Sequence, residues 1–529
     1  MAKSSKNYPV SLDALIPREA FEIKDQQERS RGTSILTMGI RDLEQNSFFY
    51  PFLRKPDFQR ETNEWDATKI CEFIESFLDR DLIPAVILWQ SCSSYYFVVD
   101  GSHRLSSLLA WINDDYGDGK ISKDFYDGNI SDEQKEAAKE TRELIKEKIG
   151  AYKDYQSFKD DQSLTSQPGL VNPKMQERAR NLGRSAITLQ WGEGDAGKAE
   201  DSFFKINQKA VPISETEMRL LQARKTPNGV AARAIVRSGN GHKYWSSFSE
   251  EKQDEIEKVA QEIHQLIFHP KLSNPIKTLD VPIVGNLSSS DKLELILEFI
   301  SIVNNISTDN QLGEDSTGDK TIKLLKQCKK VAQRINSNDP SSLGLHPLVY
   351  FYTQQGKPKI GSFYGVVSLI LHLQQTKSWS KLIKVRKDFE WVIWNYDMVP
   401  QLVAKKSDAL QARELVRDFY LEIINKLSGG VDKKNVIKEI ISDKKFGNLK
   451  TQKKTDKGEI QSKEFSRETK AFTYIRKALP GCPVCQLCGG YLPSRFNSID
   501  HITRKADGGL GTLENAQLAH FYCNSTDKN

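Results

Sequence analysis

Two short pairs of metal-ligating residues near the C-terminus constrain the fold of this chain more than any other feature. Cys485 and Cys488 form the first pair, His520 and Cys523 form the second, and residues 489–519 lie between them. Two intervening residues let a tight turn direct both side chains at one metal ion, and two such turns complete a tetrahedral zinc site. The pattern therefore predicts a small domain whose two ends are held together by structural zinc, bound by three cysteines and one histidine.

The remaining cysteines leave one ambiguity in this assignment. Cys482 and Cys485 also have the C-x-x-C spacing, so that either Cys482 or the histidine of the second pair can complete the site. Cys71, Cys92 and Cys328 are scattered singly along the chain. This distribution indicates a metal site in a reducing cytosol and not a disulfide framework.

Side chains suited to phosphodiester cleavage lie between and beside the zinc ligands. Asp500 and His501 are adjacent, Asn515 follows them, and Asn524 directly follows the last ligand. Hydrolysis of a phosphodiester needs a base for the attacking water and a divalent cation that stabilises charge on the phosphate. Histidine can supply the base, and the Asp and Asn oxygens are the hard donors that Mg²⁺ prefers.

The order and spacing of these residues, over about a tenth of the chain, resemble those of the HNH endonucleases, which cut nucleic acid with a ββα-metal fold. The resemblance implies that His501 is the general base. It implies that Asp500 and Asn524 ligate a catalytic Mg²⁺ or Mn²⁺. It also implies that Asn515 braces the loop and orients the base.

The same resemblance bears on the zinc ligands. It favours Cys485 and Cys488 over Cys482, because Gly489-Gly490 follows them as in the zinc knuckle of the family. His520 departs from the family, in which this ligand is commonly cysteine. Imidazole is nevertheless an acceptable zinc ligand.

A second motif lies in the N-terminal part of the chain. An apolar run is followed by an Asp-Gly-Ser-His-Arg segment at residues 100–104, and a helix is expected to run from there to Trp111. Backbone N–H groups at such a helix start, together with the guanidinium fork of Arg104, suit a phosphate. For His103, local packing at the helix start is the alternative.

Together with a Gln-Arg pair upstream and a Phe-x-x-x-Asn segment downstream, this motif resembles the ParB-like domain of GmrSD-type, modification-dependent restriction enzymes over about residues 35–220. The resemblance implies nucleotide binding and, in some members, hydrolysis that controls DNA cutting. Ser and His replace the two glutamines of the family's Asp-Gly-Gln-Gln-Arg signature. The implied nucleotide-binding residues are Gln59, Arg60, Asp100, Gly101, Ser102, His103, Arg104 and Asn207.

The apolar spacing predicts secondary structure along much of the chain. We expect a helix at 67–77, strands at 85–89 and 95–99, and a charged helix at 131–148 that forms a solvated insertion. Further helices are expected at 250–268, 291–306, 364–375 and 409–427, with a loop at 307–321.

Charge is concentrated before the C-terminal motif. Residues 431–477 contain 14 Lys or Arg against 7 Asp or Glu, whereas residues 478–529 contain four of each, so that this stretch accounts for the net charge of +6. It is either a solvated linker or an arm that tracks DNA phosphates through a salt-sensitive attraction. The two interpretations are compatible.

These features predict an α+β multidomain protein. We expect a ParB-like α/β nucleotide- or DNA-sensing domain at 1–245, a helical domain at 246–430, a basic linker at 431–477 and a zinc-containing ββα-metal HNH domain at 478–529. A length of 529 residues and a hydrophobic fraction of 38% suit several packed domains. No apolar run is long enough to span a membrane, which predicts a cytoplasmic protein.

The predicted function is antiphage defence by a type IV-like restriction endonuclease. In this hypothesis the HNH domain nicks or cleaves double-stranded DNA, of phage or modified, and the N-terminal domain senses a nucleoside triphosphate or the modification. Nucleotide hydrolysis and homo-oligomerisation are left open. One alternative is a non-catalytic, nucleotide-switched DNA-binding regulator of the ParB type. Another is an RNA nuclease, such as a toxin, although the sequence shows no RNA-specific aromatic platform.

Overall fold

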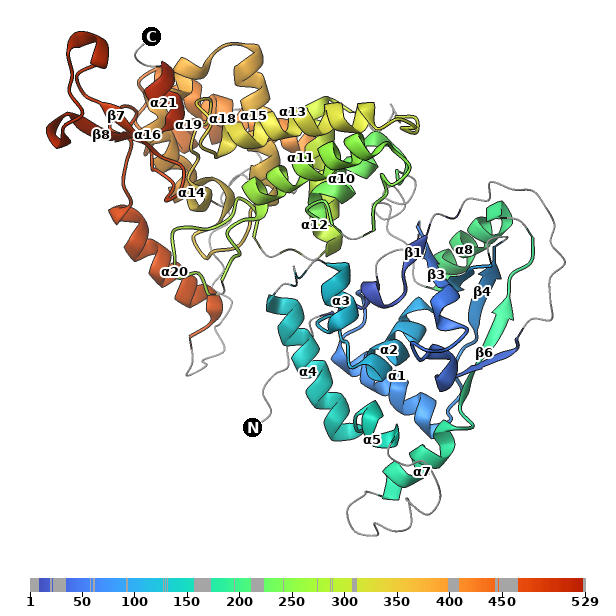
Figure 1. The fold of residues 1–529 in the computed structure, drawn as a ribbon. Coiled ribbons are helices and arrows are strands. Elements are labelled where there is room, and N and C mark those ends of the chain that lie inside the picture. The colour runs from blue at the N-terminus through green and yellow to red at the C-terminus, as the bar shows by residue number, and fades with distance from the viewer. Residues whose placement is uncertain are drawn as a thin grey trace. The chain divides into compact units, whose positions relative to one another are not determined.

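The structure is a computed structural model in which the chain forms two compact units (Figure 1). The N-terminal unit comprises Met1–Arg224 and Asn240–Tyr244, and the C-terminal unit comprises Lys225–Gly239 and Trp245–Asn529. The structure describes residues 9–526 except 20, 22–34, 58, 60–61, 92–93, 127, 129, 131, 157–172, 195, 211–222, 241, 274, 286, 288, 307–311, 398–408, 443–445 and 447–464.

A mixed six-stranded sheet forms the centre of the N-terminal unit (Figure 1). Its strands are β1 (Arg18–Glu19), β2 (Thr37–Gly39), β3 (Leu53–Pro56), β4 (Val86–Gln90), β5 (Tyr96–Asp100) and β6 (Ala186–Trp191). Their order is β1-β3-β5-β4-β6-β2. β3 and β5 are parallel, so that both strands end at the same edge of the sheet.

The helices of this unit are α1 (Ala67–Asp79), α2 (Ser102–Asn113), α3 (Lys120–Phe125), α4 (Asp132–Lys148), α5 (Tyr152–Gln156), α7 (Pro173–Leu182) and α8 (Ala196–Ala210). α1 begins where the side chain of Asp66 accepts a hydrogen bond from the backbone N–H of Lys69, and it buries Ile70, Ile74 and Phe77 on one face. The helix and the two strands predicted between residues 67 and 99 are confirmed to within about two residues.

The charged helix α4 is not the solvated insertion that its composition predicts. Ala137, Thr141 and Ile145 lie on one face at a spacing of four and are fully buried, and Ala137 and Ile145 belong to the main apolar core of the unit. A narrow stripe of small and apolar side chains is enough to bury this face, while the charged residues occupy the remaining circumference.

Helices make up most of the C-terminal unit. They are α10 (Pro227–Val236), α11 (Glu250–Phe268), α12 (Ser289–Asn304), α13 (Asp319–Ile335), α14 (Pro347–Phe351), α15 (Ile360–Gln375), α16 (Trp379–Asn395), α18 (Ala409–Ser428), α19 (Val436–Ser442) and α20 (Arg467–Ala478). The four helices expected between residues 250 and 427 are confirmed as α11, α12, α15 and α18. α13 and α16 were not expected, and α13 begins inside the segment expected to be a loop.

The C-terminal module follows α20 and has the predicted ββα order. β7 (Ser498–His501) and β8 (Ala516–Ala519) form an antiparallel hairpin, and α21 (Phe521–Thr526) follows β8 directly. The module and the helices form one compact unit. Within the basic segment at 431–477, residues 443–445 and 447–464 lie outside the described part of the chain.

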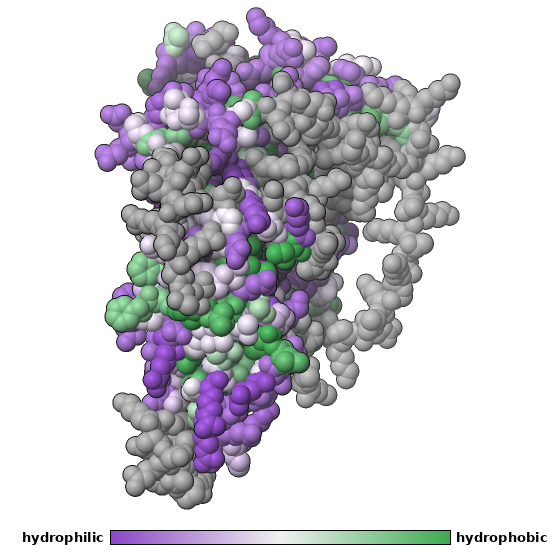
Figure 2. Space-filling view, turned by 90° about the vertical axis from the view of Figure 1, so that its right-hand side faces the viewer, coloured by the Kyte–Doolittle hydropathy of each residue, from purple (hydrophilic) through white to green (hydrophobic). Residues whose placement is uncertain are grey.

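On the face drawn in Figure 2, described residues expose both hydrophilic and apolar side chains, and the apolar ones gather in patches. Among the described residues, no helix is long and apolar enough to cross a membrane.

Candidate metal and nuclease site

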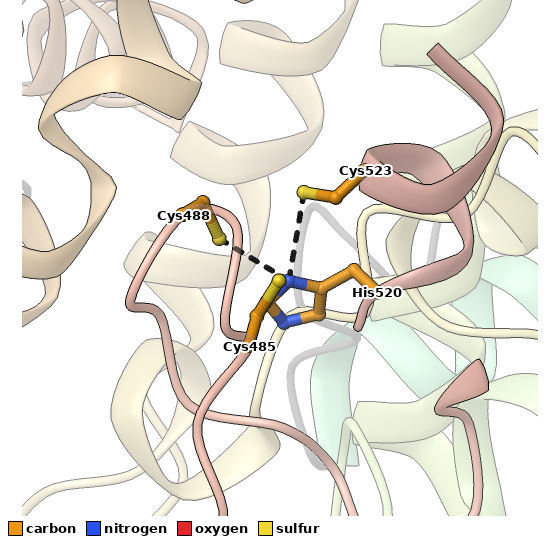
Figure 3. A group of neighbouring side chains, drawn as sticks. All are labelled: Cys485, Cys488, His520 and Cys523. Atoms are coloured by element: carbon orange, nitrogen blue, oxygen red, sulfur yellow. Dashed lines mark hydrogen bonds between the residues drawn. The ribbon is translucent and has the colours of Figure 1, made fainter. Parts of the chain in front are cut away.

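The four residues of the predicted zinc site come together in the C-terminal module (Figure 3). One ligand atom from each of Cys485, Cys488, His520 and Cys523 lies within 4.8 Å of the others. His520 Nδ1 is 3.4 Å from Cys488 Sγ and 3.8 Å from Cys523 Sγ. Zn–S bonds of about 2.3 Å in a tetrahedron place sulfur atoms about 3.8 Å apart, so this donor set is compatible with structural zinc.

The local backbone explains how the first two cysteines face each other. The N–H of Cys485 donates to the carbonyl of Gly490, and the N–H of Gly489 donates back to the carbonyl of Cys485, both at 2.8 Å. Gly489 has φ +69°, which favours glycine and lets the turn tighten. Hydrogen bonds from the thiols of Cys488 and Cys523 lower the pKa of Cys485, and a thiolate is the form that binds zinc.

Cys482 lies outside this cluster. Of the two candidates for the remaining ligand, Cys482 and His520, the structure brings His520 next to the other three cysteines. Its thiol donates to the carbonyl of Leu492 at 3.2 Å, and burial raises its pKa to about 11. The ring of His520 instead has Nε2 3.0 Å from the carbonyl of Tyr491. A proton on Nε2 leaves the lone pair of Nδ1 directed at the thiols, which is the tautomer that a zinc ligand needs.

The hairpin carries the predicted catalytic pair. Asp500 and His501 are consecutive residues at the end of β7, and Asp500 is buried whereas His501 is half-buried. Oδ2 of Asp500 accepts a hydrogen bond of 2.8 Å from Nε2 of Gln517, which pairs with it across the hairpin. Sequence reasoning missed Gln517, because its only signal is the strand register.

Asn515 braces the loop that follows Asp500 and His501. Its Oδ1 accepts from the N–H of Thr503 at 2.7 Å, and its Nδ2 donates to the carbonyls of Thr503 and Leu510 at 3.1 and 2.8 Å. Its own carbonyl accepts from the N–H of Ile502 at 2.9 Å. These bonds fix the backbone immediately after His501.

Asn524 lies against β7 although α21 has only six residues. Its Nδ2 donates to Ser498 Oγ at 3.2 Å and to the carbonyl of Ile499 at 3.4 Å, so that its Oδ1 is the atom suited to a cation. The helical part of the C-terminal unit, meaning the part that precedes the ββα module, also contacts the short helix α21. The N–H of Tyr522 donates to the carbonyl of Ser342 at 2.9 Å.

Two residues of α16 reach the metal cluster, and sequence reasoning missed both. Arg386 and Glu390 are fully buried and form an ion pair of 2.8 Å. Nη1 of Arg386 lies 3.3 Å from Nδ1 of His520, and Oε2 of Glu390 accepts from the N–H of Tyr491 at 2.7 Å. An Arg and a Glu four residues apart are usually a solvent-exposed helix pair, so their spacing does not indicate burial.

The N-terminal motif has a defined geometry at the end of β5. Gly101 has φ +100°, and an added Cβ would lie 2.7 Å from Cγ2 of Val86, so only glycine suits this turn. α2 begins at the next residue, Ser102. Nη2 of Arg104 pairs with Oδ2 of Asp100 at 2.5 Å, which orients the guanidinium beside the turn.

The structure describes only some of the other candidate nucleotide-binding residues. The ring of His103 stacks on Trp65 with centroids 5.5 Å apart. Gln59 follows β3, the parallel neighbour of β5, and its buried Oε1 has no hydrogen-bond partner among the described residues. Arg60 lies outside the described residues. Asn207 lies in α8, but its side chain is outside the described part.

The comparisons with known proteins agree with both motifs. The family model of the GmrSD restriction endonuclease N-terminal domain matches residues 40–224, and that of the HNH endonuclease matches residues 485–529. No curated protein and no solved structure matches the chain. The chain therefore joins an N-terminal domain of the GmrSD type to a C-terminal HNH endonuclease domain.

Proposed function

We propose that this protein is an antiphage restriction endonuclease of the type IV kind, which nicks or cleaves phage or modified DNA with the C-terminal module. The observation that carries the proposal is the arrangement of Asp500, His501 and Asn524. Asp500 and His501 end β7, and Asn524 of α21 donates hydrogen bonds to Ser498 and Ile499 of the same strand, directly after the cluster residue Cys523. Aspartate and asparagine oxygens next to a histidine are the groups that phosphodiester hydrolysis needs.

In this proposal His501 accepts a proton from a water molecule while the oxygen of that water forms a bond to phosphorus. The bond from phosphorus to the leaving ester oxygen breaks, and that oxygen takes up a proton from solvent. Asn515 holds the backbone beside the base through its bonds to Thr503. Asp500 and Asn524 would hold Mg²⁺ or Mn²⁺, which supplies charge stabilisation at the phosphate when bound.

Zinc has a separate, structural role in the proposal. Cys485, Cys488, His520 and Cys523 would hold it, and a closed site with four protein ligands leaves no position for a substrate. The zinc site connects the loop before β7 to the start of α21, and it therefore keeps Asn524 next to β7.

The N-terminal unit would sense a nucleoside triphosphate or a DNA modification and so control cutting. Three features support a nucleotide at the β5–α2 turn: the glycine turn at Gly101, the oriented guanidinium of Arg104, and the buried amide oxygen of Gln59, which no described residue hydrogen-bonds. The carboxyl ends of adjacent parallel strands are where α/β sheets bind nucleotides. Control of the nuclease by this unit belongs to the proposal.

A cleavage assay tests the proposed function. The full chain is incubated with Mg²⁺ or Mn²⁺ and with phage DNAs that carry different base modifications, with and without each nucleoside triphosphate. We expect nicking or cleavage of at least one DNA, and dependence on the divalent cation. Tight, salt-sensitive DNA binding without scission under every condition would instead support a ParB-type regulator. Cleavage of tRNA but not of DNA would move the substrate to RNA.

A further inference from the structure

The metal cluster of the nuclease module is enclosed by residues of the helical part of the unit. Arg386, in α16, donates to the carbonyls of Leu343 and Gly344 at 2.6 and 2.9 Å, and its Nη1 lies 3.3 Å from Nδ1 of His520. All of its side chain is buried. A guanidinium held at this many points has a fixed position beside the cluster.

Glu390 connects α16 to the same histidine by a second route. Its Oε2 accepts from the N–H of Tyr491 at 2.7 Å, and the carbonyl of Tyr491 lies 3.0 Å from Nε2 of His520. Its Oε1 accepts from the hydroxyl of Tyr350 at 2.9 Å and from Nε of Arg386 at 2.8 Å. The carboxylate therefore holds the backbone N–H of Tyr491, the residue whose carbonyl faces Nε2 of His520.

The placement of the charges bears on a metal-loaded cluster. Three thiolates and one Zn²⁺ carry a net charge of −1 in a buried place, where an uncompensated charge is unfavourable. Arg386 is the member of its ion pair that lies next to the cluster, whereas the carboxylate of Glu390 accepts from the N–H of Tyr491.

The packing leaves no space for a further side chain between the two parts at two glycines. A Cβ on Gly490 would lie 2.6 Å from Nε of Arg386, and a Cβ on Gly344 would lie 2.7 Å from Cδ2 of His520. Gly490 belongs to the zinc knuckle and Gly344 to the helical part. Each part therefore has a glycine where a side chain of the other part packs closely against its backbone.

We propose that Arg386 and Glu390 are positioning residues of the zinc site, so that the helices and the nuclease module fold around one zinc ion as a single cooperative unit. The inference rests on the proposed zinc occupancy and not on DNA cleavage. In the competing explanation the pair merely fills the core, and zinc binding depends on the four ligands alone.

The full chain is used for the test, with four variants. Arg386→Met removes the charge at similar length, Arg386→Lys keeps the charge without the fork, and Glu390→Gln keeps an acceptor without the charge. A double variant, Arg386→Met with Glu390→Leu, removes both charges. The control is Arg413→Met, which breaks another ion pair of this unit, the 2.9 Å pair between Arg413 of α18 and Glu298 of α12.

Two readouts are independent of nuclease activity: zinc affinity from competition with a coloured chelator, and thermal unfolding with and without chelator. We expect Arg386→Met and the double variant to bind zinc ~10–100-fold more weakly, as is typical when a residue that orients a ligand is lost. Arg386→Lys and Glu390→Gln should lose less of the zinc affinity than Arg386→Met does. The control should keep its zinc affinity. Chelator should lower the unfolding temperature of the helices together with the module, in one transition.

The outcomes separate the alternatives. Replacing both members of a purely structural buried pair often restores stability, so a stable double variant with unchanged zinc affinity would overturn the inference. Separate unfolding of the module and the helices on zinc removal would also overturn it. If Arg386→Met does not fold, Arg386→Lys and Glu390→Gln carry the same comparison. A wild-type protein that holds no zinc would instead contradict the proposed zinc itself.

Discussion

Gln517 donates a hydrogen bond of 2.8 Å to Oδ2 of Asp500 across the C-terminal hairpin. This bond orients the carboxylate that we propose as a cation ligand. We expect Gln517→Leu to raise the Mg²⁺ concentration for half-maximal cleavage by ~10-fold, because residues that orient a ligand typically contribute this much. A metal titration of the cleavage rate measures the effect. Gln486→Leu, on the zinc knuckle, is the control, and an unchanged titration for Gln517→Leu would refute the role.

His501 is expected to be essential for cleavage. His501→Ala should lower the cleavage rate by ~10²–10⁴-fold, which is the usual contribution of a general base. Zinc content and unfolding temperature should stay as in the wild type, since the side chain is not one of the four cluster residues. Ile499→Ala, at an exposed position of the same strand, is the control. Comparable rates for the two variants would exclude His501 as the base.

Cys485 and Cys482 should respond differently to the same substitution. Cys485→Ser removes a cluster ligand, so the protein should lose its zinc and the module should unfold. Cys482→Ser exchanges one donor to the Leu492 carbonyl for another and should keep the zinc. Metal analysis of the purified variants, together with circular dichroism, distinguishes them. Loss of zinc from Cys482→Ser alone would reverse the ligand assignment.

Gln59 offers a test of nucleotide binding that does not disturb the fold. Because its buried Oε1 accepts no hydrogen bond from the described residues, Gln59→Met leaves no described donor to that oxygen unmatched. We expect a stability within about 1 kcal/mol of wild type and a ~10-fold weaker affinity for the nucleoside triphosphate, measured by calorimetry. The control is Gln45→Met, which removes an exposed hydrogen bond that Gln45 donates to Asn113. Equal affinities for both variants would argue against a nucleotide at this turn.

His264 should make the C-terminal unit less stable in mild acid. Burial above all, together with the nearby His269 and Lys292, lowers its pKa from 6.5 to about 4, although the hydrogen bond to the carbonyl of Ile235 opposes this shift. The unfolded state thus binds a proton below pH 6.5 that the folded state does not bind until about pH 4. Stability is therefore fully present above pH 6.5 and falls as the pH is lowered towards 4.

At pH 5 this loss amounts to about 2 kcal/mol. Urea unfolding of the wild type and of His264→Gln at pH 7 and pH 5 should show a smaller pH dependence in the variant. Proton-driven zinc release affects both proteins equally, so only their difference is used. His372→Gln, a half-buried position in α15, should behave like the wild type. A difference of zero between His264→Gln and the wild type would show that His264 does not titrate in this way.

Local sequence patterns predicted most elements and the components of the metal cluster. The C-x-x-C and H-x-x-C spacings work as signals because turn geometry alone brings each pair together. The choice between Cys482 and His520 is different. It depends on which way a buried side chain turns, and here Cys482 turns to the carbonyl of Leu492.

The sequence could not reveal contacts between distant segments. Arg386 and Glu390 have the spacing of an ordinary surface pair, and only the packing of α16 on the module buries them. α4 illustrates the same difficulty, since its charges concealed a narrow buried face around Thr141. Gln517 acquires its partner through the register of the hairpin, which neither strand specifies alone.

The two glycines at the boundary of the module also limit how it can be exchanged. Gly344 and Gly490 match the opposing surfaces so closely that a foreign HNH module with any side chain at the second position would collide with Arg386. Recombination at residue 478 would therefore yield chimaeras that fail to assemble, whereas transfer of the segment from Lys225 onward would carry the matching surface and all the helices of the C-terminal unit with it. For grafting, the transplantable part is this longer segment and not the nuclease motif.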